Sequence, residues 1–179
     1  PLDSVLAPAT DPPTVEWRRA TVSGTYEAGA QVLIRDRSLN TVAGFNVVTP
    51  LRLTDGSFVV VVRGWVPGDT TAAPAPPTGT VQVEGRLRVG QVRRHSWEKA
   101  DPAEGVLDTM NRVDIARIDQ QVDGDARSMY LEVVTSNPAD ESVTAIPAPE
   151  LSDGPHLSYT VQWFLFTLAA IAGWAIAVR

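Results

Sequence analysis

The feature that most constrains this chain is an apolar run near its C-terminal end. Between Tyr159 and Val178 no residue is charged, and Gln162 is the only strongly polar side chain. About twenty helical residues span roughly 30 Å, which is the hydrocarbon thickness of a bilayer. Because lipid offers no water to the backbone, such a segment must be helical in a membrane. We therefore predict a transmembrane helix within residues 155–179; the alternative is a buried core helix.

Arg179, which follows the apolar run, predicts the orientation of this helix. Cytoplasmic flanks of membrane helices are enriched in Lys and Arg. The preference for Arg over Lys, with abundant Ala, Val, Pro and Gly, is typical of GC-rich bacterial genomes. We expect Arg179 in the cytoplasm of a bacterium and the rest of the chain on the periplasmic or outer face of its plasma membrane.

The beginning of the predicted helix carries polar and aromatic side chains on one face. His156, Tyr159, Thr160 and Trp163 follow the spacing i, i+3, i+4 and i+7, which places them together on a helix. Pro155 suits the first turn, where its missing N–H is not needed. Two interpretations stay open. One is an aromatic belt with an interfacial histidine; the other is a histidine offered to a metal or haem at the membrane edge.

Composition limits the remaining possibilities. The chain has 179 residues and a formal charge of -6, which argues against nucleic-acid binding. It has no Cys, which excludes disulfides, thiol catalysis and cysteine-held metals. Because the sequence starts at Pro1 without an initiator Met, we expect that the natural N-terminus precedes it.

The residues before the helix predict a mainly β fold, either an antiparallel sheet or a partly closed barrel with one short helix. Residues 1–14 are rich in Pro and Ala and are expected to be extended. A β-domain is expected over residues 15–136. Residues 137–154, which are Pro-rich and acidic, are expected to be a tether into the helix. The strands are predicted at residues 15–27, 30–39, 45–53, 58–62, 81–89 and 127–135.

The clearest local signal is a hairpin around Asp55–Gly56, because Gly accepts the positive φ of a tight turn. The β-branched run that follows, Phe58–Val62, predicts a strand buried on both faces. Pro50 cannot donate to a ladder, so the preceding strand should be an edge there or carry a bulge. Further along, Asn111 is predicted to cap a short helix over residues 112–118.

Catalytic signatures are not found in the sequence. It contains no Gly-rich phosphate loop, HExxH or GxSxG motif. Of the two histidines, His95 is interpreted as a surface residue on a loop. The carboxylates are scattered and are interpreted as solvated or capping groups. We therefore expect that the protein is not an enzyme, and a membrane-anchored hydrolase lacks a nucleophile–base pair in this sequence.

Four segments give the sequence a resemblance to a known family. They are Gly24-Thr-Tyr26, Gly44-Phe-Asn-Val-Val-Thr-Pro50, Arg63-Gly-Trp-Val-Pro67 and Pro155-His-Leu-Ser-Tyr-Thr-Val-Gln-Trp163. In this order and spacing they resemble the Surf1 family of cytochrome c oxidase assembly factors. The resemblance spans nearly the whole chain. It implies a two-pass membrane protein whose β-domain lies between its helices, with the first helix before Pro1.

The resemblance also implies a role for individual residues. Members of the family help to mature the catalytic subunit of haem-copper oxidases, and are thought to hold haem a and assist its insertion. His156 would then be the ligand of the haem iron, with Tyr159 and Trp163 against the porphyrin. Arg63 could pair with a haem propionate, as its planar fork suits a carboxylate; alternatively, Arg63 hydrogen-bonds a neighbouring loop. Gly24 and Gly44 are interpreted as positions required by backbone geometry.

Two functional hypotheses follow. The first is an assembly factor for aa3-type cytochrome c oxidase that handles haem a and contacts the haem-bearing catalytic subunit and the lipid bilayer. The second is a structural accessory subunit, bound permanently to the oxidase or a respiratory supercomplex without a ligand of its own. They differ at His156, whose imidazole must be accessible in the first case and engaged with the partner in the second.

Overall fold

The apolar run after the Asp55–Gly56 turn forms the central strand, β4 (Phe58–Pro67), in which every residue before Pro67 is buried. β4 pairs antiparallel with β3 (Val42–Arg52) on one side and parallel with β7 (Met129–Asn137) on the other. Gly56 adopts φ +84°, as the predicted hairpin turn requires. The prediction of a strand buried on both faces is therefore confirmed.

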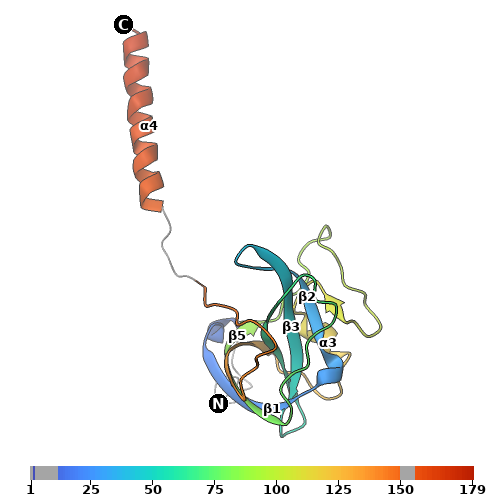
Figure 1. Cartoon of the computed structure of the whole chain (residues 1–179). Helices are drawn as coiled ribbons and strands as arrows, with labels where there is room; N and C mark the ends of the chain where they lie inside the picture. The colour runs from blue at the N-terminus through green and yellow to red at the C-terminus, as the bar shows by residue number, and fades with distance from the viewer. Residues whose placement is uncertain (1, 3–11, 150–155) are drawn as a thin grey trace. The chain divides into compact units, whose positions relative to one another are not determined.

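The computed structural model describes residues 2, 12–149 and 156–179. Seven strands form one sheet in the order β1-β5-β7-β4-β3-β2-β6, and the strands gather into a curved β-structure (Figure 1). The other strands are β1 (Arg19–Tyr26), β2 (Val32–Leu39), β5 (Thr80–Val89) and β6 (Thr109–Met110). The helical segments are α2 (Pro12–Val15), the 3-10 turn η1 (Ala28–Ala30), α3 (Ile115–Asp119) and α4 (His156–Ala177).

A short pairing between β1 and β3 closes part of the sheet into a barrel. Thr25 and Tyr26 of β1 lie opposite Arg52 and Leu51 of β3, so that β1, β5, β7, β4 and β3 form a ring. β2 and β6 extend the sheet beyond this ring. The predicted mainly β, partly closed barrel is confirmed, with one difference: the β4–β7 and β2–β6 pairs are parallel, so the sheet is mixed.

Buried apolar side chains form three clusters, and the two larger ones lie on opposite faces of β4. Val59 and Val61 join one cluster with Leu51, Val83 and Leu131. Phe58, Val60 and Val62 join the other, which also contains Ile34, Val48, Met110, Ile118 and Tyr130. Successive strand residues point to opposite faces, so one strand serves both cores. β4 therefore holds the domain together.

Pro50 lies at a gap in the pairing of β3. β2 pairs with β3 as far as Val48, and β1 begins to pair at Leu51. On this side the carbonyl of Pro50 accepts a hydrogen bond from the Glu27 N–H (2.9 Å). Pro50 has no N–H to offer a ladder, so the interruption of the pairing fits the prediction of a local edge.

Two local predictions near the ends of elements are wrong. Residues 12–15, expected to be extended or to start the first strand, form α2, because Pro is well suited to a first helical turn. Residues 1 and 3–11 of the expected extended segment lie outside the described residues. The cap of α3 is Asp114, whose carboxylate accepts from the Arg117 N–H (3.2 Å), whereas the Asn111 side chain donates to Asp101 (2.6 Å).

The β-domain extends beyond the predicted boundary at residue 136. β7 runs to Asn137, and the compact unit ends at Ile146, with residues 147–179 forming a second unit. Thr144 exchanges two backbone hydrogen bonds of 2.8 Å with Trp65. β7 pairs with β4 only around Val61 and Val62, so the segment after β7 satisfies the backbone groups of β4 farther along.

Candidate functional site

The predicted site residues belong to two separate parts of the protein. His156, Tyr159 and Trp163 lie on α4, whereas Arg63 lies on β4 of the β-domain.

α4 is long and apolar enough to cross a membrane. It runs from His156 to Ala177, and about 22 residues at 1.5 Å rise make a helix of roughly 33 Å. Its most apolar stretch of 18 residues has a mean hydropathy of 1.6. By length and composition, α4 is a candidate membrane span. Pro155, expected in the first turn, lies outside the described residues.

The first turns of α4 present the predicted aromatic face. Tyr159 is 56% exposed and Trp163 is 68% exposed, and His156 is also exposed. The Thr160 hydroxyl donates to the backbone carbonyl of His156 (2.8 Å). This bond does not involve the imidazole ring of His156. The Trp163 ring meets Phe166 edge to face, with 6.1 Å between ring centroids.

This arrangement has the chemistry to hold a flat metal-bearing ring at a membrane surface. A neutral imidazole nitrogen is the commonest axial ligand of haem iron. Aromatic rings one and two turns farther along the same helical face supply apolar area for a macrocycle. The same residues also suit an interfacial belt, because Tyr and Trp favour the headgroup level. No group of three or more His, Cys, Asp or Glu able to hold a bare metal ion occurs in the part of the chain that the structure describes.

Arg63 is buried, with its side chain 0% exposed, and its three guanidinium nitrogens all donate to groups of the β-domain. Nε donates to Asp140 (2.7 Å) and Nη2 donates to Ser142 (2.8 Å). Nη1 donates to Gln31 (2.6 Å) and to the carbonyl of Pro74 (2.9 Å). These contacts agree with the alternative interpretation, in which Arg63 hydrogen-bonds neighbouring loops. A propionate would have to displace one of these acceptors, and the pairing of Arg63 with a propionate stays a prediction.

The electrostatics around Arg63 fix the charge of its neighbours. Burial would raise the pKa of Asp140, but hydrogen bonds from Arg63 and Ser142 outweigh it and hold the pKa below its usual value. The Tyr26 ring lies 5.6 Å from the Arg63 guanidinium carbon, and burial raises the pKa of its hydroxyl. Asp140 is thus ionised and Tyr26 neutral at neutral pH, and the cluster is a charge-balanced buried network.

The glycines of the recognised segments occupy close contacts. A Cβ at Gly44 would lie 2.5 Å from the Trp65 ring and 2.2 Å from the carbonyl oxygen of Val66. A Cβ at Gly24 would lie 2.2 Å from the carbonyl oxygen of Arg52, where β1 meets β3. Neither position tolerates a side chain without a shift of backbone. Neither glycine has a positive φ, so both are required by the close approach of neighbouring strands and not by an unusual backbone conformation.

A pocket of about 280 Å³ opens beside the Arg63 network, where β7 diverges from β4. Arg63 and Asp140 contribute its charged atoms. The rest of its lining is small and mostly apolar: Val133, Val134, Thr135, Ser136, Ala139, Val143 and Ala145.

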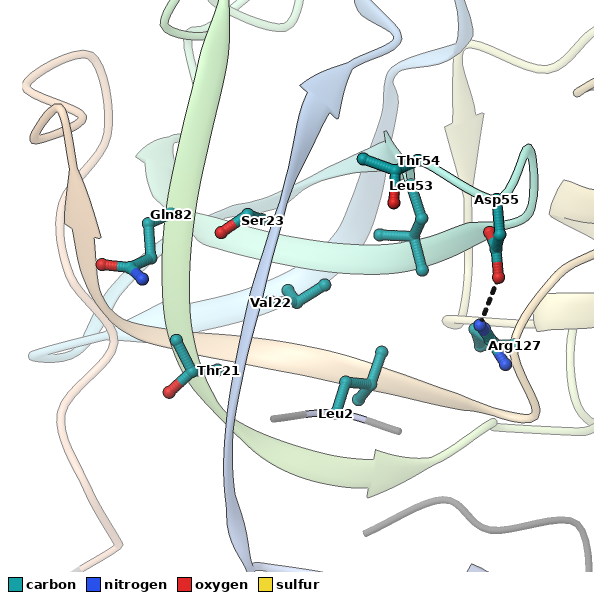
Figure 2. Close-up of a pocket in the computed structure, with 9 residues that line it drawn as sticks. All are labelled: Leu2, Thr21, Val22, Ser23, Leu53, Thr54, Asp55, Gln82 and Arg127. Atoms are coloured by element: carbon teal, nitrogen blue, oxygen red, sulfur yellow. Dashed lines mark hydrogen bonds and ion pairs between the residues drawn. The ribbon is translucent and has the colours of Figure 1, made fainter. Parts of the chain in front are cut away.

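A larger pocket, of about 530 Å³, is lined by residues of β1, β5 and the β3–β4 hairpin and is drawn in Figure 2. Thr21 and Ser23 of β1 and Gln82 of β5 line one side, and Asp55 pairs with Arg127 at 2.7 Å on the other. Hydrogen bonds from Ser57 hold the pKa of Asp55 below its usual value. The pocket offers hydroxyl, amide and paired-charge groups, and neither of the two histidines of the chain lines it.

The sequence did not single out the partners of Arg63. Asp140 and Ser142 were assigned to the tether and Gln31 to a strand end. A signal existed: Arg63 follows a run of buried valines, and a buried guanidinium needs an acid. Asp140-Glu-Ser142 is also a local turn, in which Ser142 donates to Asp140 through its N–H (3.1 Å) and hydroxyl (2.6 Å).

Comparison with known proteins finds relatives that all belong to one family. The family model described as the SURF1 family matches residues 1–168. An uncharacterized SURF1-like protein of Mycobacterium tuberculosis is 29% identical over 166 residues, which cover 90% of this chain and 59% of the relative. A SURF1-like protein of Monosiga brevicollis is 34% identical over 94 residues, covering 45% of this chain and 34% of the relative. The chain thus spans about three fifths of the length of its mycobacterial relatives.

Proposed function

The chain belongs to the SURF1 family, and on that premise we propose that it is a membrane-anchored assembly factor for aa3-type cytochrome c oxidase. Members of this family are generally cytochrome oxidase assembly factors. We propose further that the protein handles haem a as cargo, transiently, and passes it to the haem-bearing catalytic subunit. It performs no chemical conversion in this proposal, and it needs no catalytic residue.

The observation that carries the haem proposal is the face of α4 formed by His156, Tyr159 and Trp163. These side chains lie on the first turns of a helix with the length of a membrane span, and all three are exposed. His156 would hold the iron, and Tyr159 and Trp163 would lie along the porphyrin. Exposure matters here because cargo must enter and leave from the side.

The proposed location follows from α4 and its flanks. In this proposal α4 anchors the protein in the bacterial plasma membrane, and the β-domain lies on the periplasmic or outer face. Haem a would then be passed to the catalytic subunit from that face. Arg179 beyond the apolar run supports this orientation.

A second candidate is the structural accessory subunit, and the Arg63 network favours it. Arg63, Asp140 and Ser142 satisfy one another within the domain, and Gly24 and Gly44 serve strand packing. Arg63, Gly24 and Gly44 therefore have structural roles within the β-domain. In this alternative α4 and the β-domain clamp an oxidase and bind no haem.

The two candidates are separated by His156→Ala, with His95→Ala as the matched control. The full protein is purified from detergent-solubilised membranes of a host that makes the oxidase, and the eluate is examined for haem a spectra and oxidase subunits. His156 is exposed, so its loss should cost the stability of the protein on the order of 1 kcal/mol or less. The assembly proposal expects normal association, reduced haem a and less assembled oxidase.

Two other outcomes for His156→Ala would contradict the haem proposal. If His156→Ala keeps full oxidase assembly and full haem a, the ligand role is excluded and the accessory-subunit candidate takes its place. If the variant loses association with the oxidase, His156 is an interface residue and the haem role has no support. His95→Ala, on an exposed loop of the β-domain, should change none of the measurements.

A further inference from the structure

The central part of the long loop between β5 and β6, residues 91–106, has a basic and aromatic outer surface. It contains no strand, yet α3 and the residues before it hold it in place. Arg112 pairs with Glu98 (3.2 Å), and Arg117 donates to the carbonyl of Pro102 (2.9 Å). The Asn111 side chain donates to Asp101 (2.6 Å). The loop is thus tied down along its inner side by several polar contacts.

These contacts separate the charges of the loop. The carboxylates of Glu98 and Asp101 are 22% and 10% exposed, because both turn inward to Arg112 and Asn111. The cationic residues Arg93, Arg94 and Lys99 are exposed. Glu104 is the exposed carboxylate within residues 91–106. Asp108, at the end of the loop before β6, is a second exposed acid. Three cations therefore face outward against two acids, on a protein whose formal charge is -6.

A tryptophan stands among these cations. Trp97 is 81% exposed, and its ring stacks on His95 with 5.4 Å between centroids and 7° between planes. Val92 and Val106, at the two ends of the loop, are 63% and 75% exposed. The β-domain gives these apolar groups no cover. An exposed Trp beside Arg and Lys matches the headgroup level of a membrane, where the ring is half immersed and the cations meet phosphate.

We propose that the 91–106 loop binds anionic phospholipid at the membrane surface and thereby orients the β-domain. Residues 147–155 connect the domain to α4, and such a segment spans at most about 30 Å when fully extended. With α4 inserted, the domain therefore works close to lipid. An acidic surface is repelled by anionic lipid, so the outward cations of this loop select which side of the domain approaches the membrane.

The absence of Cys from the chain permits a direct test. Ser96→Cys, within the loop, is labelled with a polarity-sensitive fluorophore in the full protein reconstituted into lipid nanodiscs. Thr71→Cys, on the exposed loop between β4 and β5, is the matched control. Emission and quenching by headgroup-level nitroxide lipids are compared between phosphatidylcholine alone and phosphatidylcholine mixed with phosphatidylglycerol. Thermal melting of each variant confirms that it is folded.

The proposal expects that the label at position 96 shifts to the blue and is quenched only when anionic lipid is present, and that the label at position 71 does not respond. Arg94→Glu or Lys99→Glu should lower the ratio of membrane-bound to released loop at least about fivefold, because each cation near an anionic surface contributes about that factor. Trp97→Ser should also reduce quenching.

The proposal is overturned if the two labels respond alike, or if the charge reversals have no effect. It is also overturned if position 96 responds only when purified oxidase is added to phosphatidylcholine nanodiscs, since the loop would then bind a protein. None of these measurements involves haem, so they stand apart from the test of His156.

Discussion

Arg63 and Asp140 form an ion pair, with 2.7 Å between Nε and Oδ2 and with side chains 0% and 8% exposed. It joins the central strand β4 to the segment that follows β7. In the same segment, the Ser142 hydroxyl accepts a hydrogen bond from the Arg63 guanidinium, and Thr144 exchanges backbone hydrogen bonds with Trp65. This connection fixes where the chain leaves the β-domain on its way to α4.

Asp140→Ala should destabilise the β-domain by about 3–5 kcal/mol, because it leaves the buried Arg63 charge without its carboxylate. Asp140→Asn should cost less, since the amide oxygen can still accept from Nε. Denaturant unfolding monitored by tryptophan fluorescence measures both. Asp69→Ala, on an exposed turn, is the control and should stay within about 0.5 kcal/mol of the parent. Equal stability of Asp140→Ala and the control would contradict a structural role of the pair.

The same pair predicts a dependence of stability on acid pH. The pKa of Asp140 is lower in the folded protein than its usual value, so its ionised form stabilises the fold. That contribution is complete above the unfolded value of about 4 and is lost as pH falls through the folded pKa. The free energy of unfolding should therefore fall less steeply below about pH 4 in Asp140→Asn than in the parent. Identical slopes would show that Asp140 does not titrate with unfolding.

Val60→Asp should abolish folding of the β-domain. Val60 is 0% exposed between β3 and β7, and an unpaired buried carboxylate costs several kcal/mol. Val42→Asp, at a position 53% exposed on β3, is the matched control and should fold. Circular dichroism and a thermal melt distinguish the two. A cooperative melt of Val60→Asp near that of the parent would rule out its place in the core.

Thr41→Gly should stabilise the protein by about 1 kcal/mol. Asn40 and Thr41 connect β2 to β3 with φ of 49° and 68°, and a β-branched residue is strained in this region. Two such residues are typical of a hairpin turn that favours Asn-Gly. Gly56→Thr, at φ +84°, is the reciprocal change and should destabilise by a similar amount. A lower melting temperature for Thr41→Gly would contradict the strain.

The orientation of α4 can be tested with reporters. A cytoplasm-specific reporter fused after Arg179 should be active, and a periplasm-specific reporter should be silent there, because the positive flank favours the cytoplasm. A periplasmic reporter placed in the exposed loop at Thr71 is the opposite control. Activity of the periplasmic reporter after Arg179 would reverse the proposed location of the β-domain.

The sequence alone determined the features that depend on local pattern. The uncharged run predicted α4, the β-branched run predicted the buried strand β4, and Asp55–Gly56 predicted its hairpin. The spacing of His156, Tyr159 and Trp163 placed them on one helical face, because the helical period depends only on the local backbone. These predictions needed no knowledge of which segments meet in space.

Only the tertiary structure decided the partners of residues far apart in the chain. Closure of the ring by β1 and β3 and the parallel pairing of β4 with β7 depend on the path of the whole chain. Asp140 belongs to an acidic, Pro-rich stretch that resembles a solvated tether, yet it is buried against Arg63. The physical reason is that a guanidinium buried by its strand needs a carboxylate partner. Which carboxylate lies within reach depends on the tertiary fold and cannot be read from distance along the sequence.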